Sequence, residues 1–566
     1  MVLRLLQKEI PSIHGAAFLI GAAGFLSRLL GIFRDRLLAS QFGASRTLDV
    51  YYASFQIPDF VFTVFLVGAA SAAIIPLFLK FSDEGWGKAE KLIGGLLSVF
   101  SVGAVIIAGG VAVFASALVS VIAPGFSPAE HELMTQMTRI MMMSPVFLGF
   151  SNIIAAVMQA RRQFLVFALT AIVYNVGIIL GILFFVPIMG ARGLAWGVVL
   201  GAVLHLAIQI PVLWRVKFRP IFTSWYQIQG LSEVFMLSLP RVFALSLNQL
   251  MMLILVALGS LLAAGSIAIF QFSNNLRYLP IGIFGVSYAI AAFPKLTEAA
   301  LKKSGKEFSR DLNAMVETIL FWVVPLAFLT VVLRAHIVRL GLGAGYFSWG
   351  DTRLTAAALA ILSVTMIAEA LSPLFIRAFY ALGNTRLPFA ASLLTVLVVA
   401  GSAPFLLSLF TGHRLSGQWI ADFLKVGDLP DVAVLGLVMA LALGAAVQMA
   451  MLGFALNFEM KKFFGASVKN DMVTALLRTV FAAGLAAFVG YGTLYILSFW
   501  VSLATFWGVF LQAAGTFLAS AVCYAGIMYF GGSEEVRSVV EAFKKHALSQ
   551  SALPESIDDE SRLQTK

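Results

Sequence analysis

Long apolar stretches recur along the whole 566-residue chain, and they limit the fold more than any other feature. A helix needs about 20 consecutive apolar residues to cross the hydrocarbon of a bilayer. Apolar residues make up 60% of the sequence and charged residues only 12%, about half the share found in soluble domains. A membrane β-barrel would show short segments of alternating polarity instead. The sequence therefore predicts an all-α polytopic membrane protein.

About 14 segments are long and apolar enough to be transmembrane helices. They lie at 14–40, 49–79, 92–123, 133–158, 164–188, 192–214, 232–262, 266–294, 312–334, 354–380, 386–411, 432–457, 472–498 and 502–530. An even number places both termini on one side of the membrane. Most of the 39 Lys and Arg residues lie in loops on that side or in the C-terminal tail. The positive-inside rule therefore predicts that both termini are cytoplasmic, and it explains the net charge of +11 without a nucleic-acid partner.

The chain contains an internal repeat. A shift of 222 residues aligns 42–58 with 264–280, placing Gly43 on Gly265 and Pro58 on Pro280. A looser match joins 152–178 to 374–399. These matches predict two parallel six-helix lobes followed by two more helices, the general plan of an alternating-access transporter. The predicted units are an N-lobe at 1–220, a C-lobe at 221–457, two helices within 458–532 and a cytoplasmic tail at 533–566.

Charged side chains occur inside the first predicted span. Arg28, Arg34 and Asp35 follow Ser27 within an apolar run, and Asp49 stands at the start of the second span. A charge near the bilayer centre costs about 2.5–3.5 kcal/mol on insertion scales. The second copy of the repeat lacks these charges, so the helix itself does not require them.

Two interpretations of the arginines remain open. Arg28 and Arg34 could line a wet cavity that attracts an anionic group, because a planar guanidinium grips phosphate at two points. Alternatively, either arginine could form a structural ion pair with Asp35.

In the C-lobe, Arg277 lies beside two asparagines and is a further cavity candidate. Glu369 and Arg377 share one helix face, either as a structural pair or as a site.

No pattern for covalent chemistry is present in the sequence. The six histidines show no metal-site spacing, and Lys88 and Lys306 follow glycines without the Ser or Thr of a Walker A motif. The single cysteine, Cys523, excludes an intramolecular disulfide. We therefore expect a transporter without a catalytic residue, a bound metal or a cofactor, although a coupling ion remains possible.

The motif SRLLGIFRDRLLASQFGASRTLDVYYASFQIPDF at 27–60, followed by GAASAAIIPLF at 68–78, resembles the first two helices of the MurJ/MviN family of lipid II flippases. The segments LPIGIFGVSYAIAAFPKL at 279–296 and RAFYALGNTRLP at 377–388 continue the likeness in order. The resemblance covers roughly residues 15–530.

The resemblance implies a MATE-like exporter fold in the bacterial inner membrane. The cargo would be undecaprenyl-pyrophosphate carrying a disaccharide-pentapeptide, called lipid II, moved to the outer leaflet for peptidoglycan synthesis. Transport would use the membrane potential or ions, the protein would be a monomer, and the last two helices would form a groove for the lipid tail. By motif match, the substrate-binding residues would be Ser27, Arg28, Arg34, Asp35 and Asp49, with Asn275 at a family arginine position and Arg277 nearby.

Departures from the family pattern leave alternatives open. Phe62, Thr63 and Val67 stand where the family commonly has two arginines and an acidic residue in the second helix. The cargo could therefore be another polyprenyl-pyrophosphate-linked glycan. An ion-coupled exporter of small molecules with the same fold is a further alternative, as are a membrane enzyme acting on lipid-linked sugars and a scaffold of a cell-wall complex.

Overall fold

The computed structural model describes residues 13–64, 71–161, 163–215, 219–221, 231–411, 415–465, 472–533 and 535–537. These residues are almost entirely helical, and no strand occurs among them, as the apolar pattern predicts. Most of the predicted tail at 533–566 lies outside the described residues, as does Val67.

The first group of helices, here named the N-lobe, runs from α2 to α12. Its members are α2 Ile13–Phe42, α3 Arg46–Ser54, α4 Gln56–Phe62, α5 Ser71–Glu84, α6 Trp86–Ile122, α7 Pro128–Met141, α8 Met143–Ala160, α9 Phe164–Leu180, the π-helix η2 Gly181–Phe185, α10 Val186–Met189, α11 Arg192–Ala207 and α12 Ile210–Arg215.

The second group, here named the C-lobe, runs from α13 to α20, and two further helices follow it. The C-lobe comprises α13 Leu231–Ser260, α14 Ser266–Pro280, the π-helix η4 Ile281–Val286, α15 Ser287–Leu301, α16 Gly305–Leu342, α17 Trp349–Ala381, α18 Arg386–Thr411, the short α19 Leu415–Phe423 and α20 Val434–Phe464. The chain then forms α21 Met472–Trp500 and α22 Phe506–Phe530.

Eleven helical segments within the described residues are long and apolar enough to cross a membrane. The three remaining predicted spans correspond to α2, to the sequence of short helices α3, α4 and α5, and to α13. The total of 14 spans therefore stays a prediction. The helix α19 was not predicted, because its nine residues lie between two much longer apolar runs.

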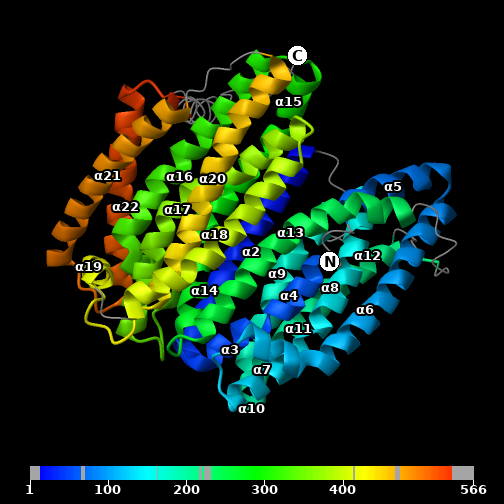
Figure 1. Ribbon diagram of the computed structural model, residues 1–566, viewed down its shortest axis with the longest axis horizontal. Helices are drawn as coiled ribbons and strands as arrows, with labels where there is room; N and C mark the ends of the chain where they lie inside the picture. The colour runs from blue at the N-terminus through cyan, green and yellow to red at the C-terminus, as the bar shows by residue number, and fades with distance from the viewer. Residues whose placement is uncertain are drawn as a thin grey trace, which may run out of the picture.

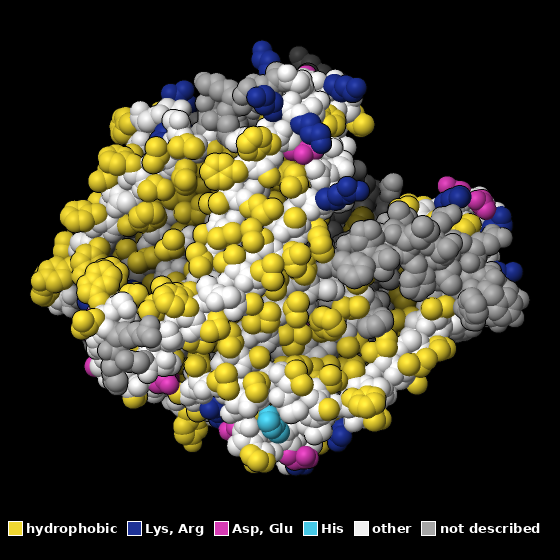
Figure 2. All heavy atoms as spheres, in the orientation of Figure 1, with side chains coloured by type: hydrophobic (Ala, Val, Ile, Leu, Met, Phe, Trp, Pro, Cys, Tyr) yellow, Lys and Arg dark blue, Asp and Glu magenta, His cyan; other side chains and the backbone are white. Residues whose placement is uncertain are grey.

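The two lobes lie side by side, with α21 and α22 on the outer side of the C-lobe (Figure 1). Helix α13 contacts α4, α5 and α6 of the N-lobe as well as α14, α18 and α20 of the C-lobe, so it bridges the two. Hydrophobic side chains cover the middle of the visible C-lobe face, and Lys and Arg gather at its upper end (Figure 2). This distribution fits a belt of lipid with a basic rim on one side.

Four buried apolar clusters hold the helices together. One lies inside the N-lobe, one mainly inside the C-lobe, and one joins the C-lobe to α21 and α22. The fourth contains Leu38 and Met134 of the N-lobe together with Phe272 and Leu342 of the C-lobe. The lobes therefore share a core, and this core lies close to the loops that precede α3, α7, α14 and α17.

The internal repeat has a backbone counterpart. Gly43 and Gly265, which the 222-residue shift superimposes, have φ of +61° and +90°. Few other residues adopt such angles without strain. Pro58 and Pro280 each lead into π-helical turns, at residues 63–64 and 281–286. The two copies thus break and resume the helix at matching positions.

The contact between α9 and α11 depends on glycine. A Cβ at Gly177 would lie 2.3 Å from Gly201 Cα, closer than real contacts allow. We expect Gly177→Ala to destabilise the protein by at least about 1–3 kcal/mol, the usual cost of overpacking. Gly103→Ala is a matched control, because a Cβ at Gly103 would touch nothing within 4 Å. Thermal unfolding of the purified proteins checks this, and equal melting temperatures would contradict it.

Candidate functional site

The charged part of α2 lies between the two lobes. Helix α2 packs along α9 of the N-lobe and also contacts α14 and α16 of the C-lobe. The charges that the sequence places inside the first span are therefore positioned where the lobes face each other.

Arg34 is held within the N-lobe by its neighbours. Its Nε and Nη2 donate to Asp35 Oδ1 at 3.0 and 2.8 Å, and its Nη1 donates to Asn175 Oδ1 of α9 at 3.3 Å. The Arg34 side chain remains 21% exposed. A guanidinium has five N–H donors, so these three bonds leave two of them available. The structural ion pair and a free binding edge therefore coexist on one arginine.

Asp35 links the lobes at mid-helix. Its second carboxylate oxygen accepts a 2.8 Å hydrogen bond from Asn275 Nδ2 of α14. Its side chain is almost fully buried, and a buried carboxylate needs such partners to offset its lost hydration. Asn275, at the position where the family resemblance expects arginine, therefore contacts Asp35 through its amide.

Arg28 reaches from α2 to the C-lobe. Its Nη1 donates to the Leu279 carbonyl at 3.3 Å, and no carboxylate pairs with it among the described residues. Its guanidinium fills the space above Gly282, where an added Cβ would lie 2.0 Å from both terminal nitrogens. A larger residue at 282 would have to turn the guanidinium away from this position. Arg28 thus keeps most of its donors free of protein partners.

Ser27 and Asn175 tie α2 to α9. The Ser27 hydroxyl donates to the Ala171 carbonyl at 3.1 Å and accepts from Asn175 Nδ2 at 3.1 Å. Asn175 therefore touches both Ser27 and Arg34 and fixes the charged face of α2. Asn175 was not among the predicted site residues. Its signal in the sequence is the one amide side chain within the apolar run 164–188.

Arg277 is buried in the C-lobe. Its Nη1 contacts Glu369 Oε1 at 2.6 Å and Thr365 Oγ1 at 2.7 Å, and its side chain is 3% exposed. Asn274 accepts two further hydrogen bonds from it. Of the two interpretations of Glu369 and Arg377, the structural pair is not formed, because Glu369 turns to α14 while Arg377 donates to the Pro373 carbonyl.

Asp49 joins the lobes at the loop end of α14. Its side chain is fully buried and accepts hydrogen bonds from the backbone N–H groups of Gly265 at 2.7 Å and Ala268 at 2.9 Å. Helix α14 has no capping side chain of its own. A carboxylate at a helix N-terminus satisfies unpaired N–H groups and the positive end of the helix dipole. Asp49 therefore caps a helix of the other lobe.

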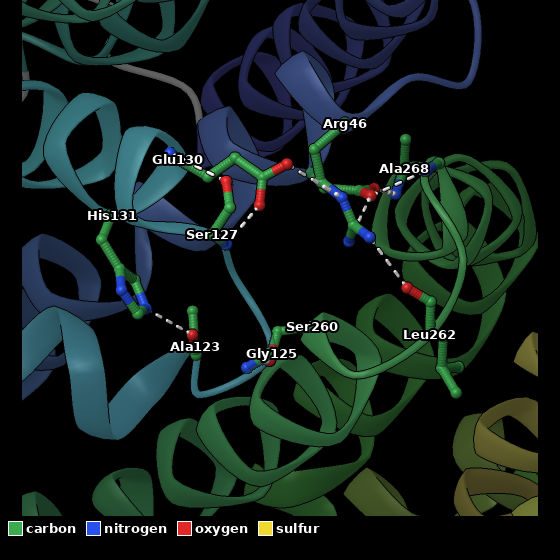
Figure 3. Close-up of polar contacts among 11 residues, drawn as sticks. Arg46, Ala123, Gly125, Ser127, Glu130, His131, Ser260, Leu262 and Ala268 are labelled. Carbon is green, nitrogen blue, oxygen red and sulfur yellow. Dashed lines mark hydrogen bonds and ion pairs between the residues drawn. The ribbon is translucent and has the colours of Figure 1, made fainter.

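Arg46 extends this contact across three helices (Figure 3). It donates to the Leu262 carbonyl at 3.0 Å, lies 3.5 Å from Asp49 Oδ2 and 3.4 Å from Glu130 Oε1. Glu130 is itself part of the capping box that begins α7 with Ser127. The network thus connects the starts of α3, α7 and α14. Arg46 and Glu130 were not predicted as site residues, because both lie in loops between the predicted spans, where charged residues are common.

The same end of the molecule carries a pair of repeat-related contacts. Gly125 donates through its N–H to Ser260 Oγ at 3.1 Å, and Tyr346 N–H, next to Gly345, donates to the Ser40 carbonyl at 2.9 Å. Ser40 and Ser260 are 220 residues apart, as are Gly125 and Gly345. The capping box of α7 likewise has its counterpart in Ser348 and Asp351 at the start of α17, 221 residues on. We name these contacts the interlobe latch, made by Ser40, Gly43, Arg46, Asp49, Gly125, Glu130, Ser260, Gly265, Gly345 and Tyr346.

Comparison with known proteins identifies a family. The family model described as lipid II flippase MurJ matches residues 38–511. A lipid II flippase MurJ of Burkholderia cenocepacia is 25% identical over 70% of this chain and 78% of its own length. A probable lipid II flippase MurJ of Bdellovibrio bacteriovorus is 26% identical over 94% of this chain and 98% of its own.

Solved structures show the same fold. A lipid II flippase MurJ in an inward closed conformation matches 90% of this chain and 99% of its own with a TM-score of 0.71 and 21% identity. An inward-facing multidrug resistance MATE family transporter matches 78% of this chain and 96% of its own, with a TM-score of 0.62 and 13% identity. The predicted MATE-like fold is confirmed, and the chain is a multi-pass membrane protein that belongs to the lipid II flippase MurJ family.

Proposed function

We propose that this protein moves lipid II from the cytoplasmic to the outer leaflet of a bacterial inner membrane. Membership of the MurJ family carries the proposal, and the lobe-facing arginines of α2 support it. Both termini would be cytoplasmic, because the loops at the end opposite the latch hold the basic segments 295–310 and 461–462. The latch would then face outward.

In this mechanism Arg28 and Arg34 bind the pyrophosphate. Arg34 offers the two N–H donors that Asp35 and Asn175 leave free, and Arg28 offers those not used by the Leu279 carbonyl. Charge-assisted bonds of this kind are stronger than neutral ones. Asp35 holds Arg34 in place directly, and Ser27 does so through Asn175. A closed latch keeps the bound head group from the outer side until the lobes rock.

The lipid tail would lie along α21 and α22. An apolar cavity of about 230 Å³ lies between α16 and these two helices, lined by residues such as Phe321, Leu326 and Ala487. A second, of about 260 Å³, lies between α16, α17, α20 and α21. The linings of both cavities are apolar, so they suit the hydrocarbon of a polyprenyl chain better than a polar head group.

A second candidate cargo is another polyprenyl-pyrophosphate-linked glycan. Phe62 and Thr63 stand where the family commonly has arginines, and Thr63 accepts a hydrogen bond from Gln249 of α13. Thr63 therefore contributes a contact with α13, and neither Phe62 nor Thr63 adds a charge to the site. The driving ion and the monomeric state remain expectations.

The first prediction concerns the arginines of α2. Arg28→Ala and Arg34→Ala should each lower transport by at least about 10-fold, the loss of one charge-assisted hydrogen bond, without lowering membrane abundance. Complementation of a flippase-depleted bacterium, with outer-leaflet accessibility of lipid II as readout, measures this. Arg353→Ala is the control, since Arg353 pairs with the exposed Asp428. Normal growth on both variants would rule out the mechanism.

The second prediction concerns the latch. Asp49→Ala removes the cap of α14, so the latch end should open more often. In a Cys523→Ser background, a Ser260→Cys thiol is buried when the latch is closed. Its labelling by a maleimide in purified protein should rise about 10-fold in Asp49→Ala. Asp428→Ala at the same end should have no effect, and unchanged labelling in Asp49→Ala would contradict the assignment.

The third prediction separates folding from transport at Arg277. Glu369→Ala leaves a buried guanidinium without its carboxylate, which should cost about 3–5 kcal/mol of unfolding free energy. Glu298→Ala, in the exposed pair with Lys302, should cost no more than about 1 kcal/mol. Thermal unfolding measures both. The double variant Arg277→Met/Glu369→Leu should regain stability and transport; a stable but inactive double variant would instead place Arg277 in cargo binding.

A further inference from the structure

Helix α19 exposes a row of large apolar side chains on the C-lobe. Leu415, Trp419 and Phe423 are 89%, 69% and 72% exposed. They are spaced four residues apart, so they share one helix face. The rings of Trp419 and Phe423 stack with their centroids 5.8 Å apart. Single exposed apolar residues are common on protein surfaces, whereas a continuous apolar face marks a surface that contacts a partner or a membrane.

The opposite side of α19 packs onto the C-lobe. Gly417 and Ala421 are buried, and a Cβ at Gly417 would lie 2.0 Å from the carbonyl oxygen of Leu409 in the last turn of α18. Ile420 and Ala421 belong to the apolar cluster that lies mainly inside the C-lobe. One side of α19 is therefore covered by the protein, and the exposed row points away from it.

A third side of α19 is polar. Gln418 and Asp422 are exposed there, and Gln418 Nε2 donates to the Gly427 carbonyl at 3.4 Å in the loop that follows the helix. Arg353, in the first turn of α17, holds the same loop through a 2.8 Å hydrogen bond to Asp428. Helix α19 thus has a protein side, a polar side next to a charged loop, and an apolar side.

The place of α19 in the fold is the boundary of the membrane. It follows the end of α18, a helix long and apolar enough to cross a membrane, after residues 412–414. Its charged loop contacts the start of α17, which lies next to the interlobe latch. Trp500 and Trp507, at the turn between α21 and α22, are exposed at the same end of the molecule (Figure 1). Tryptophan is enriched where a membrane meets water.

We propose that α19 is an interfacial helix that lies on the membrane surface at the latch end, with Leu415, Trp419 and Phe423 inserted among the lipid acyl chains. The chain is a multi-pass membrane protein, and the exposed row of α19 continues the lipid-facing surface on which α18 exposes Phe405. A helix with one apolar and one polar side binds at the boundary between head groups and acyl chains. Lipid therefore covers this face, and α19 fixes the depth of the C-lobe in the membrane. The inference does not depend on the cargo.

The test places single fluorescent labels on the full chain in a Cys523→Ser background, reconstituted in vesicles of phosphatidylcholine and phosphatidylglycerol. Phe423→Cys reports on the apolar side, Gln418→Cys is the matched control on the polar side of the same helix, and Leu397→Cys is the reference on the exposed surface of α18. Two quenchers are compared, a nitroxide on the lipid acyl chain just below the head group and iodide on both sides of the membrane.

The label at residue 423 should be quenched at least about 2-fold more by the nitroxide, and at least about 2-fold less by iodide, than the label at residue 418, because the apolar side of an interfacial helix lies about 5–10 Å below the head groups. The label at residue 397 should respond to the nitroxide and not to iodide. Trp419→Cys repeats the measurement on the apolar side, so a local distortion in one variant does not decide the result.

Two outcomes would overturn the proposal. Equal quenching by iodide at residues 423 and 418 would place the whole helix in water. Protection of residue 423 from both quenchers would show that a second copy of the chain, rather than lipid, covers the face. Thermal unfolding at the temperature of the Cys523→Ser parent shows that each labelled variant is folded.

Discussion

A single carboxylate placed at the start of a helix in the opposite lobe organises the meeting of the two halves. Asp49 supplies the cap that α14 lacks, and it does so while fully buried. Burial strengthens the hydrogen bonds of Asp49. It also raises the free-energy cost of breaking them, because the carboxylate would be left without partners. The lobes are therefore fastened at one end by an interaction that is either complete or absent, which suits a molecule with two discrete conformations.

The two lobes share the same backbone arrangement, but the charged side chains of α2 occur in only one of them. Ser40 and Ser260, like Gly43 and Gly265, make corresponding contacts because the duplicated helices break at the same positions. The charges of α2 have no such counterpart, since Arg34 corresponds to Val256, a buried residue of the shared core. The duplicated fold thus provides the two lobes, and one copy alone carries the charges to which the proposed function assigns anion binding.

Much of the architecture could be predicted from hydropathy, because a membrane helix must satisfy its backbone internally and expose apolar side chains to lipid. The pairing of polar side chains could not be predicted in the same way. Periodicity places Arg277 and Glu369 each on a face of its helix, but the choice between Arg377 and Arg277 as partner depends on how α14 and α17 approach each other. Arg46 was missed for a similar reason, because its partners come from three separate loops and helices.

The packing of Arg28 against Gly282 makes the direction of one charge depend on a residue of the other lobe. A Cβ at residue 282 would lie 2.0 Å from both terminal nitrogens of Arg28. These nitrogens end a long and flexible side chain, so a larger residue at 282 would turn the guanidinium aside rather than break the packing of the helices. A substitution at residue 282 would therefore redirect this charge without removing it.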